Sequence, residues 1–503
     1  MQKEVGIIGA GISGLLACKY IKAKGFNPIV FETKHNIGGL WTKTLESTQL
    51  QTPKQFFQFS DFPWPSYVTT HFPTQQDVLD YITAYANHFD LLKYIKFNTK
   101  VQGIEYQGDV NSYGKWTLSV KNNDNNSTQV YTVDFVILCI GRFSDVPNIP
   151  EFPINRGPEV FGGKVIHSMD YALLNAQSAT ELVKGKQVTI VGFQKSALEV
   201  AMECSTLNGT KYPCRVLYKT KHWNIPDFLP WGIPLAYFYL NRFSELMVHK
   251  PNQTFFLCLI AILLTPLRWA FSKFVESYIK RKLKLKKFGM VPECSFHQDI
   301  SSCTVALVPE KFYDKVEEGS IILKKAPRFC FCKDGILIDE EEEEEASSLN
   351  TDLVILATGF RGDKKLKDIF VSSTFQNLIY GSSNEIVPLY RDCIHPHIPQ
   401  LAVIGYSESF TNLFTSEMKS RWVAELLDGT FQLPNIKEMV KDVKEWDEYM
   451  KKYSRQNYRK SCIAVLHIWY NDQLCKDMGW NPKRKNGFFA ELFEPYGPLD
   501  YSS

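Results

Sequence analysis

EVGIIGAGISG, residues 4–14, is an apolar run that ends in three spaced glycines, Gly9, Gly11 and Gly14. Residues 15–21 continue with the apolar spacing of a helix. Glycines at these positions permit a sharp turn after a strand, let a pyrophosphate approach the backbone and allow the helix to pack closely on the strand. The free N–H groups at the start of the helix attract the anion. The stretch therefore predicts a strand, a turn and a helix that bind a dinucleotide, with a purely structural turn as the alternative.

A second apolar strand, residues 28–31, ends in Glu32. An acidic side chain at this distance from the glycine turn accepts hydrogen bonds from ribose hydroxyls and disfavours a 2′-phosphate. The first site is therefore expected to hold FAD or NAD. Its predicted contacts are Gly9, Ala10, Gly11, Ile12, Ser13, Gly14 and Glu32.

A second strand, turn and helix are predicted over residues 187–204, where VTIV runs into GFQKSA. Gln194 replaces the second glycine, which should hinder close approach of a phosphate, whereas Lys195 is able to pair with one. The next strand ends in Lys219 and Thr220, a basic end that suits the 2′-phosphate of NADPH. The alternative is a structural unit whose lysines are merely solvated. The predicted NADPH contacts are Gly192, Phe193, Gln194, Lys195, Ser196, Ala197, Lys219 and Thr220.

The twelve cysteines include no C-x2-C pair, and Cys330 with Cys332 has no matching second half. Neither a metal site nor a dithiol redox centre is predicted, and most thiols are expected to be reduced and packed. Without a dithiol, a flavin reduced by NADPH must pass its electrons elsewhere, and molecular oxygen is the obvious acceptor.

Charge and targeting signals limit the partners. Lys and Arg number 57 against 54 Asp and Glu, a net charge of +3 that does not favour nucleic acid. No signal peptide precedes the first strand, so a cytoplasmic location is expected. The apolar run 255–267, interrupted by Pro266, predicts a buried or interfacial helix. The basic run from Lys280 to Lys287 is read as a solvated face, or as part of a peripheral membrane contact through 255–287 on the cytosolic face of the endoplasmic reticulum.

Between the two nucleotide units stands Phe161-x-Gly163-x3-His167-x3-Tyr171, and at these positions the chain resembles flavin-containing monooxygenases. The segment 356–360, LATGF, is similar to the family's return to the FAD domain. The turn at 38–41 is similar to a second flavin-contacting turn, so the resemblance adds Leu40 and Trp41 to the FAD contacts. In this family the histidine segment is mainly structural, and His167 is not predicted to be catalytic.

The resemblance is closest to the plant branch that N-hydroxylates pipecolic acid to make a systemic-immunity signal, and it rests on the segments 59–65, 167–171, 192–197, 222–226 and 481–485. It implies that FAD, NADPH and O2 act through a C4a-hydroperoxyflavin on a small amine. Many relatives have an asparagine near the flavin where this chain has Gln51, so Gln51 is the one candidate catalytic residue. An exposed loop glutamine is the alternative. S-oxygenation or carbonyl oxygenation of another metabolite also stays open, as does an uncoupled NADPH oxidase or flavin-based sensor.

These features predict an α/β protein with two Rossmann-like dinucleotide-binding domains, the second inserted in the first, and a mainly helical C-terminal region. The expected FAD-binding part covers residues 1–160, and the NADPH-binding domain covers 161–330, with a helical insertion around 227–300. Residues 331–503 return to the FAD domain and form the helical region. An acidic run at 339–345 is expected to be a solvated loop. The oligomeric state is left open.

Overall fold

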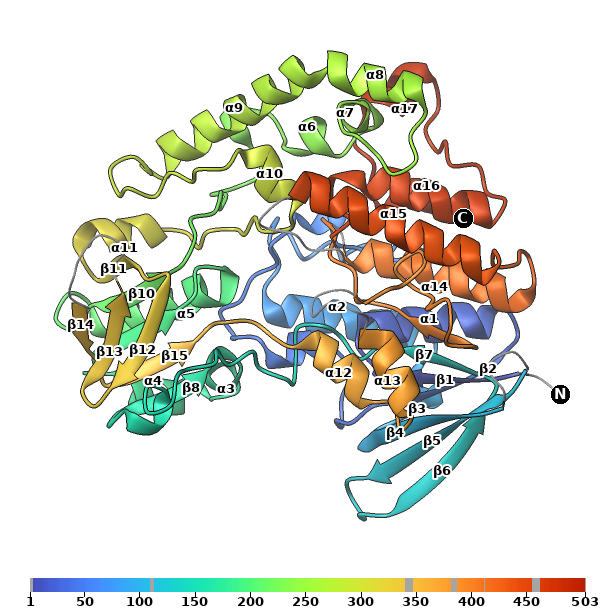
Figure 1. Cartoon of the computed structure of the whole chain (residues 1–503), viewed down its shortest axis with the longest axis horizontal. Coiled ribbons are helices and arrows are strands. Elements are labelled where there is room, and N and C mark those ends of the chain that lie inside the picture. Colours follow the sequence, from blue (N-terminus) through green and yellow to red (C-terminus); the bar gives the residue numbers. More distant parts are fainter. Residues whose placement is uncertain are drawn as a thin grey trace.

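Two five-stranded parallel sheets organise the molecule (Figure 1). The computed structural model describes residues 3–108, 113–339, 347–380, 387–410, 412–454 and 462–502. Most of the acidic run predicted to be a loop lies outside these residues. The predicted α/β class with two Rossmann-like domains and a helical C-terminal region is confirmed.

The first sheet is built from both ends of the chain. Its strands lie in the order β16 (Leu401–Val403), β7 (Phe135–Leu138), β1 (Glu4–Ile8), β2 (Asn27–Phe31) and β3 (Ile95–Lys96). All four residues of β7 are buried, as expected for a strand covered on both faces. The strands β4 (Thr99–Gln107), β5 (Lys115–Asn122) and β6 (Thr128–Val133) form a separate antiparallel sheet, and α2 spans Gln75–His88.

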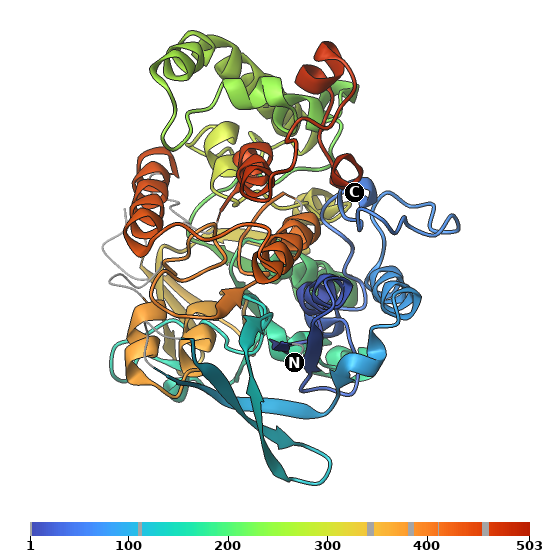
Figure 2. The same ribbon diagram turned by 90° about the vertical axis from the view of Figure 1, so that its right-hand side faces the viewer.

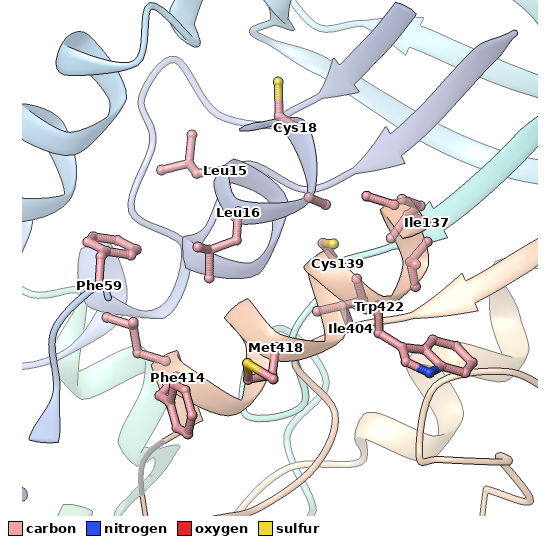
Figure 3. Close-up of a cluster of buried hydrophobic side chains, with 14 of the residues drawn as sticks. Leu15, Leu16, Cys18, Phe59, Ile137, Cys139, Ile404, Phe414, Met418 and Trp422 are labelled. Carbon is pink, nitrogen blue, oxygen red and sulfur yellow. The ribbon is translucent and has the colours of Figure 1, made fainter. Parts of the chain in front are cut away.

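Two helices from opposite ends of the sequence pack together in this domain. They are α1 (Ile12–Ala23) and α14 (Asn412–Asp428). Figure 3 shows Leu16 of α1 near Met418 of α14, beside Cys139 at the end of β7, and all three belong to one buried cluster. The core thus ties the C-terminal region to the first glycine turn.

The second sheet has the order β11 (Ile321–Lys325), β10 (Cys214–Tyr218), β9 (Val188–Val191), β15 (Leu353–Leu356) and β8 (Lys164–His167). Its accompanying helices are α3 (Ser168–Ala172), α4 (Ala176–Val183), α5 (Lys195–Asn208) and α11 (Phe312–Glu318). The strands β12 (Arg328–Cys332), β13 (Gly335–Asp339) and β14 (Ser347–Asn350) form an antiparallel sheet next to it.

The predicted domain boundary at 331 is too early. The strand β15 pairs with both β8 and β9, so the chain up to Leu356 belongs to the second unit and returns to the first only afterwards. The two connections between the units run side by side, because the N–H of Asn148 donates to Gly359 O at 2.9 Å and that of Arg361 donates to Val146 O at 2.8 Å. These two backbone hydrogen bonds join the connections and so restrict the relative orientation of the two units.

A helical layer lies above both sheets (Figures 1 and 2). The insertion contributes α6 (Ala236–Tyr239), α7 (Arg242–Leu246), α8 (Phe255–Leu263), α9 (Thr265–Lys282) and α10 (Phe296–Ser301). The last third of the chain contributes α15 (Ile436–Ser454), α16 (His467–Asp477) and α17 (Phe488–Phe493). The helices α12 (Gly362–Asp368) and α13 (Ser373–Tyr380) lie instead beside the antiparallel sheet of the first domain, where Phe370 and Phe375 pack with Trp116.

A disulfide between Cys303 and Cys462 joins the insertion to the C-terminal region. This pair is the exception to the expectation that most thiols are reduced, because two cysteines distant in sequence meet where these segments pack. The other ten cysteines are free, and six of them are buried.

The predicted helix over 255–267 forms, but it is not buried. It is divided into α8 and α9, with Pro266 in the first turn of α9. Phe255 is 85% exposed and Phe256 is 67% exposed. Among the described residues no single helix is long and apolar enough to cross a membrane, whereas α8 and α9 together, bent by 47°, meet that length and composition.

Candidate functional site

The first glycine turn has the geometry that its sequence predicts. Gly9 has φ +103°, and a Cβ on Gly14 would lie 1.8 Å from the carbonyl oxygen of Gly9. A Cβ on Gly11 would lie 3.4 Å from the Cα of Gly39, so two backbone segments approach each other closely there. Gly11 begins α1 with no side-chain cap. The N–H groups at the start of α1 are therefore available to an anion, as a pyrophosphate site requires.

Glu32 holds this turn from the end of β2. Its Oε2 accepts the N–H of Ala10 at 2.7 Å, and its Oε1 accepts the N–H of Lys34 at 2.9 Å. Each carboxylate oxygen retains a further lone pair that is able to accept a ribose hydroxyl. The residue thus has a structural role that the sequence pattern did not reveal, in addition to its predicted one.

Residues from the C-terminal region complete the turn. The Ser13 hydroxyl donates to Ser416 Oγ at 3.3 Å, and a Cβ on Gly405 would lie 2.2 Å from Ser13 Oγ. Sequence reasoning missed Gly405 and Ser416 as site residues, because no motif links them to the N-terminal glycines. The sequence offered one local indication of Gly405, which is that it closely follows the apolar strand β16.

The second flavin-contacting turn and the candidate catalytic residue lie on loops. Leu40 and Trp41 are in a short 3-10 helix, η1 (Gly39–Lys43), where Leu40 is exposed and Trp41 packs against Phe57 with ring centroids 5.9 Å apart. Gln51 is exposed. Its neighbour Thr52 donates to Phe410 O at 3.4 Å, which joins the Gln51 loop to the segment after β16.

The second glycine turn repeats the architecture of the first. Gly192 has φ +129°, and its Cβ would lie 2.4 Å from Ala357 O, just as a Cβ on Gly9 would lie 2.5 Å from Cys139 O. In both units the turn packs on the end of the neighbouring strand. Gln194 begins α5 without a side-chain cap, so the N-terminus of α5 is also available to a phosphate.

The predicted NADPH contacts fall into two groups. Phe193 and Ala197 are buried, and Lys195 pairs with Glu199 at 2.7 Å instead of pointing at a phosphate site. Ser196, Lys219 and Thr220 are exposed, the first at the start of α5 and the others at the end of β10. Gln194 Nε2 donates to Thr304 O at 3.0 Å. The glutamine side chain is thus held by the neighbouring loop.

Side-chain contacts bring the two units together next to these turns. The Thr48 hydroxyl donates to Glu199 Oε2 on α5 at 3.1 Å. The Ser47 hydroxyl donates to Glu203 Oε1, also on α5, at 2.5 Å. The first-domain loops therefore lie against the helix that begins at the second turn, as transfer between two dinucleotides requires.

His167 has a structural position. Its Nδ1 accepts the N–H of Met169 at 3.1 Å at the start of α3, and its ring lies 5.3 Å from that of Phe360. Burial lowers the pKa of His167, so the ring is neutral near pH 7. These contacts give His167 a structural role at the start of α3.

Comparisons with known proteins identify the family. The model of the family described as FMO-like, flavin-binding monooxygenase-like, matches residues 2–491. The chain is 41% identical to the probable flavin-containing monooxygenase 1 of Arabidopsis thaliana, over 99% of this chain and 96% of that protein. It is 38% identical to the putative flavin-containing monooxygenase 2 of the same plant, over 96% of this chain and 98% of that protein.

A solved structure supports the fold at a greater distance. An oxidized steroid monooxygenase bound to NADP superimposes with a TM-score of 0.65 at 16% identity, covering 95% of this chain and 98% of that one. The family and its NADP-bound structural neighbours agree that the enzyme uses FAD and NADPH. The chain belongs to the flavin-binding monooxygenase-like family and is an NADPH-dependent flavin monooxygenase.

Proposed function

We propose that this enzyme transfers one oxygen atom to the nitrogen of a small amine, with pipecolic acid as the first candidate, and thereby serves plant defence. The proposed roles of FAD and NADPH rest on two helix N-termini that have no side-chain cap. The N-terminus of α1 lies next to Glu32, and that of α5 follows the strand that pairs with β10, after which Lys219 stands. The similarity of five segments to the pipecolate N-hydroxylating branch supports the substrate. The balanced reaction consumes the amine, O2, NADPH and a proton, and it releases the hydroxylamine, NADP+ and water.

The chain's own residues have separate tasks in this proposal. The N-terminus of α1, including Gly11 and Ser13, binds the pyrophosphate of FAD, and Glu32 accepts hydrogen bonds from its ribose. Leu40 and Trp41 would contact the flavin when it is bound. The N-terminus of α5 and Ser196 bind the pyrophosphate of NADPH, while Lys219 and Thr220 bind its 2′-phosphate.

Bound flavin, reduced by NADPH, supplies the oxygen-transfer chemistry. No acid–base pair is required of the protein, whose main tasks are to orient the amine and exclude water. Gln51 is assigned a positioning role, because its loop is joined through Thr52 to the segment after β16.

The direct test uses purified, FAD-loaded protein in stopped-flow absorbance with NADPH and then oxygen. We expect the flavin absorbance to fall when NADPH is added. Oxygen should then restore this absorbance, faster when pipecolate is present, and mass spectrometry should detect N-hydroxypipecolate. Oxygenated sulfur or carbonyl compounds in place of the hydroxylamine would redirect the substrate class. NADPH consumption that yields only hydrogen peroxide would favour the uncoupled oxidase or sensor.

We further propose that the enzyme is cytoplasmic and binds peripherally to the endoplasmic reticulum membrane through residues 255–287. Large apolar side chains on α8 and α9 are exposed, and α17, which carries the exposed Phe488 and Phe489, lies on the same side of the molecule as α8 (Figures 1 and 2). Lys284 and Lys287 pair with Glu317, whereas the exposed Lys282 and Lys286 are available to anionic headgroups.

Vesicle sedimentation tests this contact. We expect the protein to sediment with phosphatidylcholine–phosphatidylserine vesicles, and the double variant Phe255→Ser, Phe256→Ser to remain largely in the supernatant because it loses buried apolar area. Ile154→Ser, which alters an equally exposed apolar residue elsewhere, serves as the control. Equal sedimentation of all three proteins would show that α8 does not make the contact.

A further inference from the structure

A cavity of about 510 Å³ lies between the helical insertion and the C-terminal region. Its walls come from α9, α10, α15 and the 3-10 helix η7 (Ala464–Leu466). None of the residues of the two glycine turns lines it. It is therefore separate from the sites assigned to FAD and NADPH.

One wall of the cavity offers polar atoms without partners. The Nδ1 of His297 and the Oγ of Ser301 are buried and have no hydrogen-bond partner. Ser272 is already engaged, because it donates to Glu276 Oε1 at 3.0 Å and accepts the N–H of His297 at 3.2 Å. Unpaired buried polar atoms cost free energy, so the two free groups indicate a missing polar ligand.

The charged side chains among the described residues that line the cavity are positive. Arg268 and Lys452 line the cavity, and no aspartate or glutamate is among its described lining residues. The Nη1 of Arg268 donates to Met247 O at 3.0 Å. Burial, followed by the proximity of Arg268, lowers the pKa of His297 to about 3, so its ring is neutral. A neutral imidazole beside a guanidinium suits an anion that also accepts hydrogen bonds.

The opposite wall is apolar. Met450, Leu466, Val248 and Val465 line it, together with the ring of Tyr449. A ligand that fits both walls has an anionic end and a compact hydrocarbon body. A phosphate or sulfate alone would leave the apolar surface uncovered, and a neutral hydrocarbon would leave the guanidinium without an anionic partner.

We propose that this cavity binds a small carboxylate with an apolar ring or chain. The carboxylate lies on Arg268 and accepts the hydroxyl of Ser301, while the hydrocarbon body packs against Met450 and Leu466. Nothing in the glycine turns or in the family motifs assigns this site. The binding of a carboxylate here does not require the proposed function. Only the further identification of this carboxylate with the amine substrate rests on the proposed function.

The cavity is connected to the Gln51 loop through one segment. Ile463, which lines the cavity, donates its N–H to Glu408 O at 2.7 Å. Two residues further on, Phe410 accepts a hydrogen bond from Thr52 and packs against Phe56 with ring centroids 6.1 Å apart. The bound carboxylate is thus either an amino-acid substrate on its way to the flavin or an effector that acts through this segment.

Calorimetric titration of the FAD-loaded enzyme tests the site without turnover. The probes are cyclohexanecarboxylate, which has no amine to oxygenate, and cyclohexanecarboxamide, which has the same shape but no charge. We expect the carboxylate to bind at least about tenfold more tightly than the amide, because only the anion pairs with Arg268. Absence of carboxylate binding, or equal binding of both probes, overturns the proposal, and this comparison needs no variant.

Variants then locate the site. Arg268→Met should weaken carboxylate binding by about tenfold or more, and Ser301→Ala by a smaller factor. Arg281→Met makes the same change on the same helix at a residue that does not line the cavity, and it should bind like the unmodified protein. Unchanged binding by Arg268→Met would place the carboxylate elsewhere.

Steady-state kinetics with pipecolate separate the two sources of the ligand. If the site lies on the substrate route, Arg268→Met raises the KM for pipecolate and leaves kcat almost unchanged. If it holds an effector, KM is unchanged, and cyclohexanecarboxylate alters the rate of the unmodified enzyme but not that of the variant. Failure of pipecolate turnover would count against the proposed substrate and leave the calorimetric result standing.

Discussion

Gln194 shows how a side chain changes the meaning of a motif. The sequence predicts that a glutamine at the second glycine position hinders a phosphate, but its amide is held by Thr304 O. Phosphate approach depends on where the side chain lies as well as on its size. Hydrogen bonding to a loop more than a hundred residues away is not visible in the local pattern.

Lys219 is expected to select NADPH over NADH. Lys219→Met should raise the KM for NADPH by about tenfold and leave the KM for NADH unchanged, because only NADPH carries the 2′-phosphate. Steady-state oxidation of both nucleotides measures this. Lys184→Met, at an exposed lysine of the same domain, is the control. An equal rise for both nucleotides would mean that Lys219 does not bind this phosphate.

Glu245 is expected to make stability depend on pH. It is buried, it accepts the N–H groups of Ile468 and Trp469, and burial raises its pKa from 4.5 to about 7. Between these values the folded protein holds more protons than the unfolded chain, so the free energy of unfolding falls as pH rises from 4.5 to 7. The fall should reach about 3 kcal/mol and then level off.

Urea unfolding at several pH values tests this expectation. In Glu245→Gln the contribution to the slope is absent, because glutamine does not titrate, while its amide oxygen still accepts a backbone N–H. The same slope in both proteins would show that Glu245 keeps an ordinary pKa.

At the scale of elements, α1 and α14 are joined by buried charges as well as by apolar packing. Glu417 on α14 accepts the Tyr20 hydroxyl of α1 at 2.6 Å and the N–H of Ser60 at 2.9 Å. Arg421, one turn later, pairs with Glu417 at 3.2 Å and donates to Tyr501 O at 2.7 Å. Four segments that are distant in sequence therefore meet at one polar cluster beside α1, the helix that follows the first glycine turn.

Removing one member of this cluster should be costly. Arg421→Met is expected to lower the free energy of unfolding by about 3–5 kcal/mol, because it leaves Glu417 charged and buried. Lys24→Met breaks a more exposed contact with Glu425 between the same two helices and should cost about 1 kcal/mol or less. Equal losses in urea unfolding would contradict the role given to burial.

At the scale of the whole molecule, the Cys303–Cys462 disulfide closes a loop of 159 residues between the insertion and the C-terminal region. Cys462→Ser should lower the free energy of unfolding by about 2–4 kcal/mol, because the unfolded chain regains the freedom that the link removes. Cys258→Ser changes a free cysteine and should have little effect. A strong dithiol reductant should abolish the difference, and a difference that persists would mean that the disulfide does not stabilise the fold.

The sequence by itself determined the two nucleotide turns, because strand, glycines and helix follow one another within about twenty residues. It also indicated the acidic end of β2 and the basic end of β10, which lie at the expected positions. Local patterns are sufficient here because the backbone conformation of each turn depends on its own glycines. Gly9 and Gly192 both have positive φ, and each lies so close to the neighbouring backbone that a Cβ would collide with a carbonyl oxygen.

Tertiary structure alone decided which distant segments complete the site. Gly405 and Ser416 reach Ser13, β15 enters the second sheet beyond the predicted boundary, and the apolar helix α8 is left exposed. The cavity beside Arg268 likewise has walls from segments far apart in the chain. Burial, pairing across a sheet and cavity shape depend on which elements meet in space, and hydrophobic periodicity within one element carries no information about its neighbours.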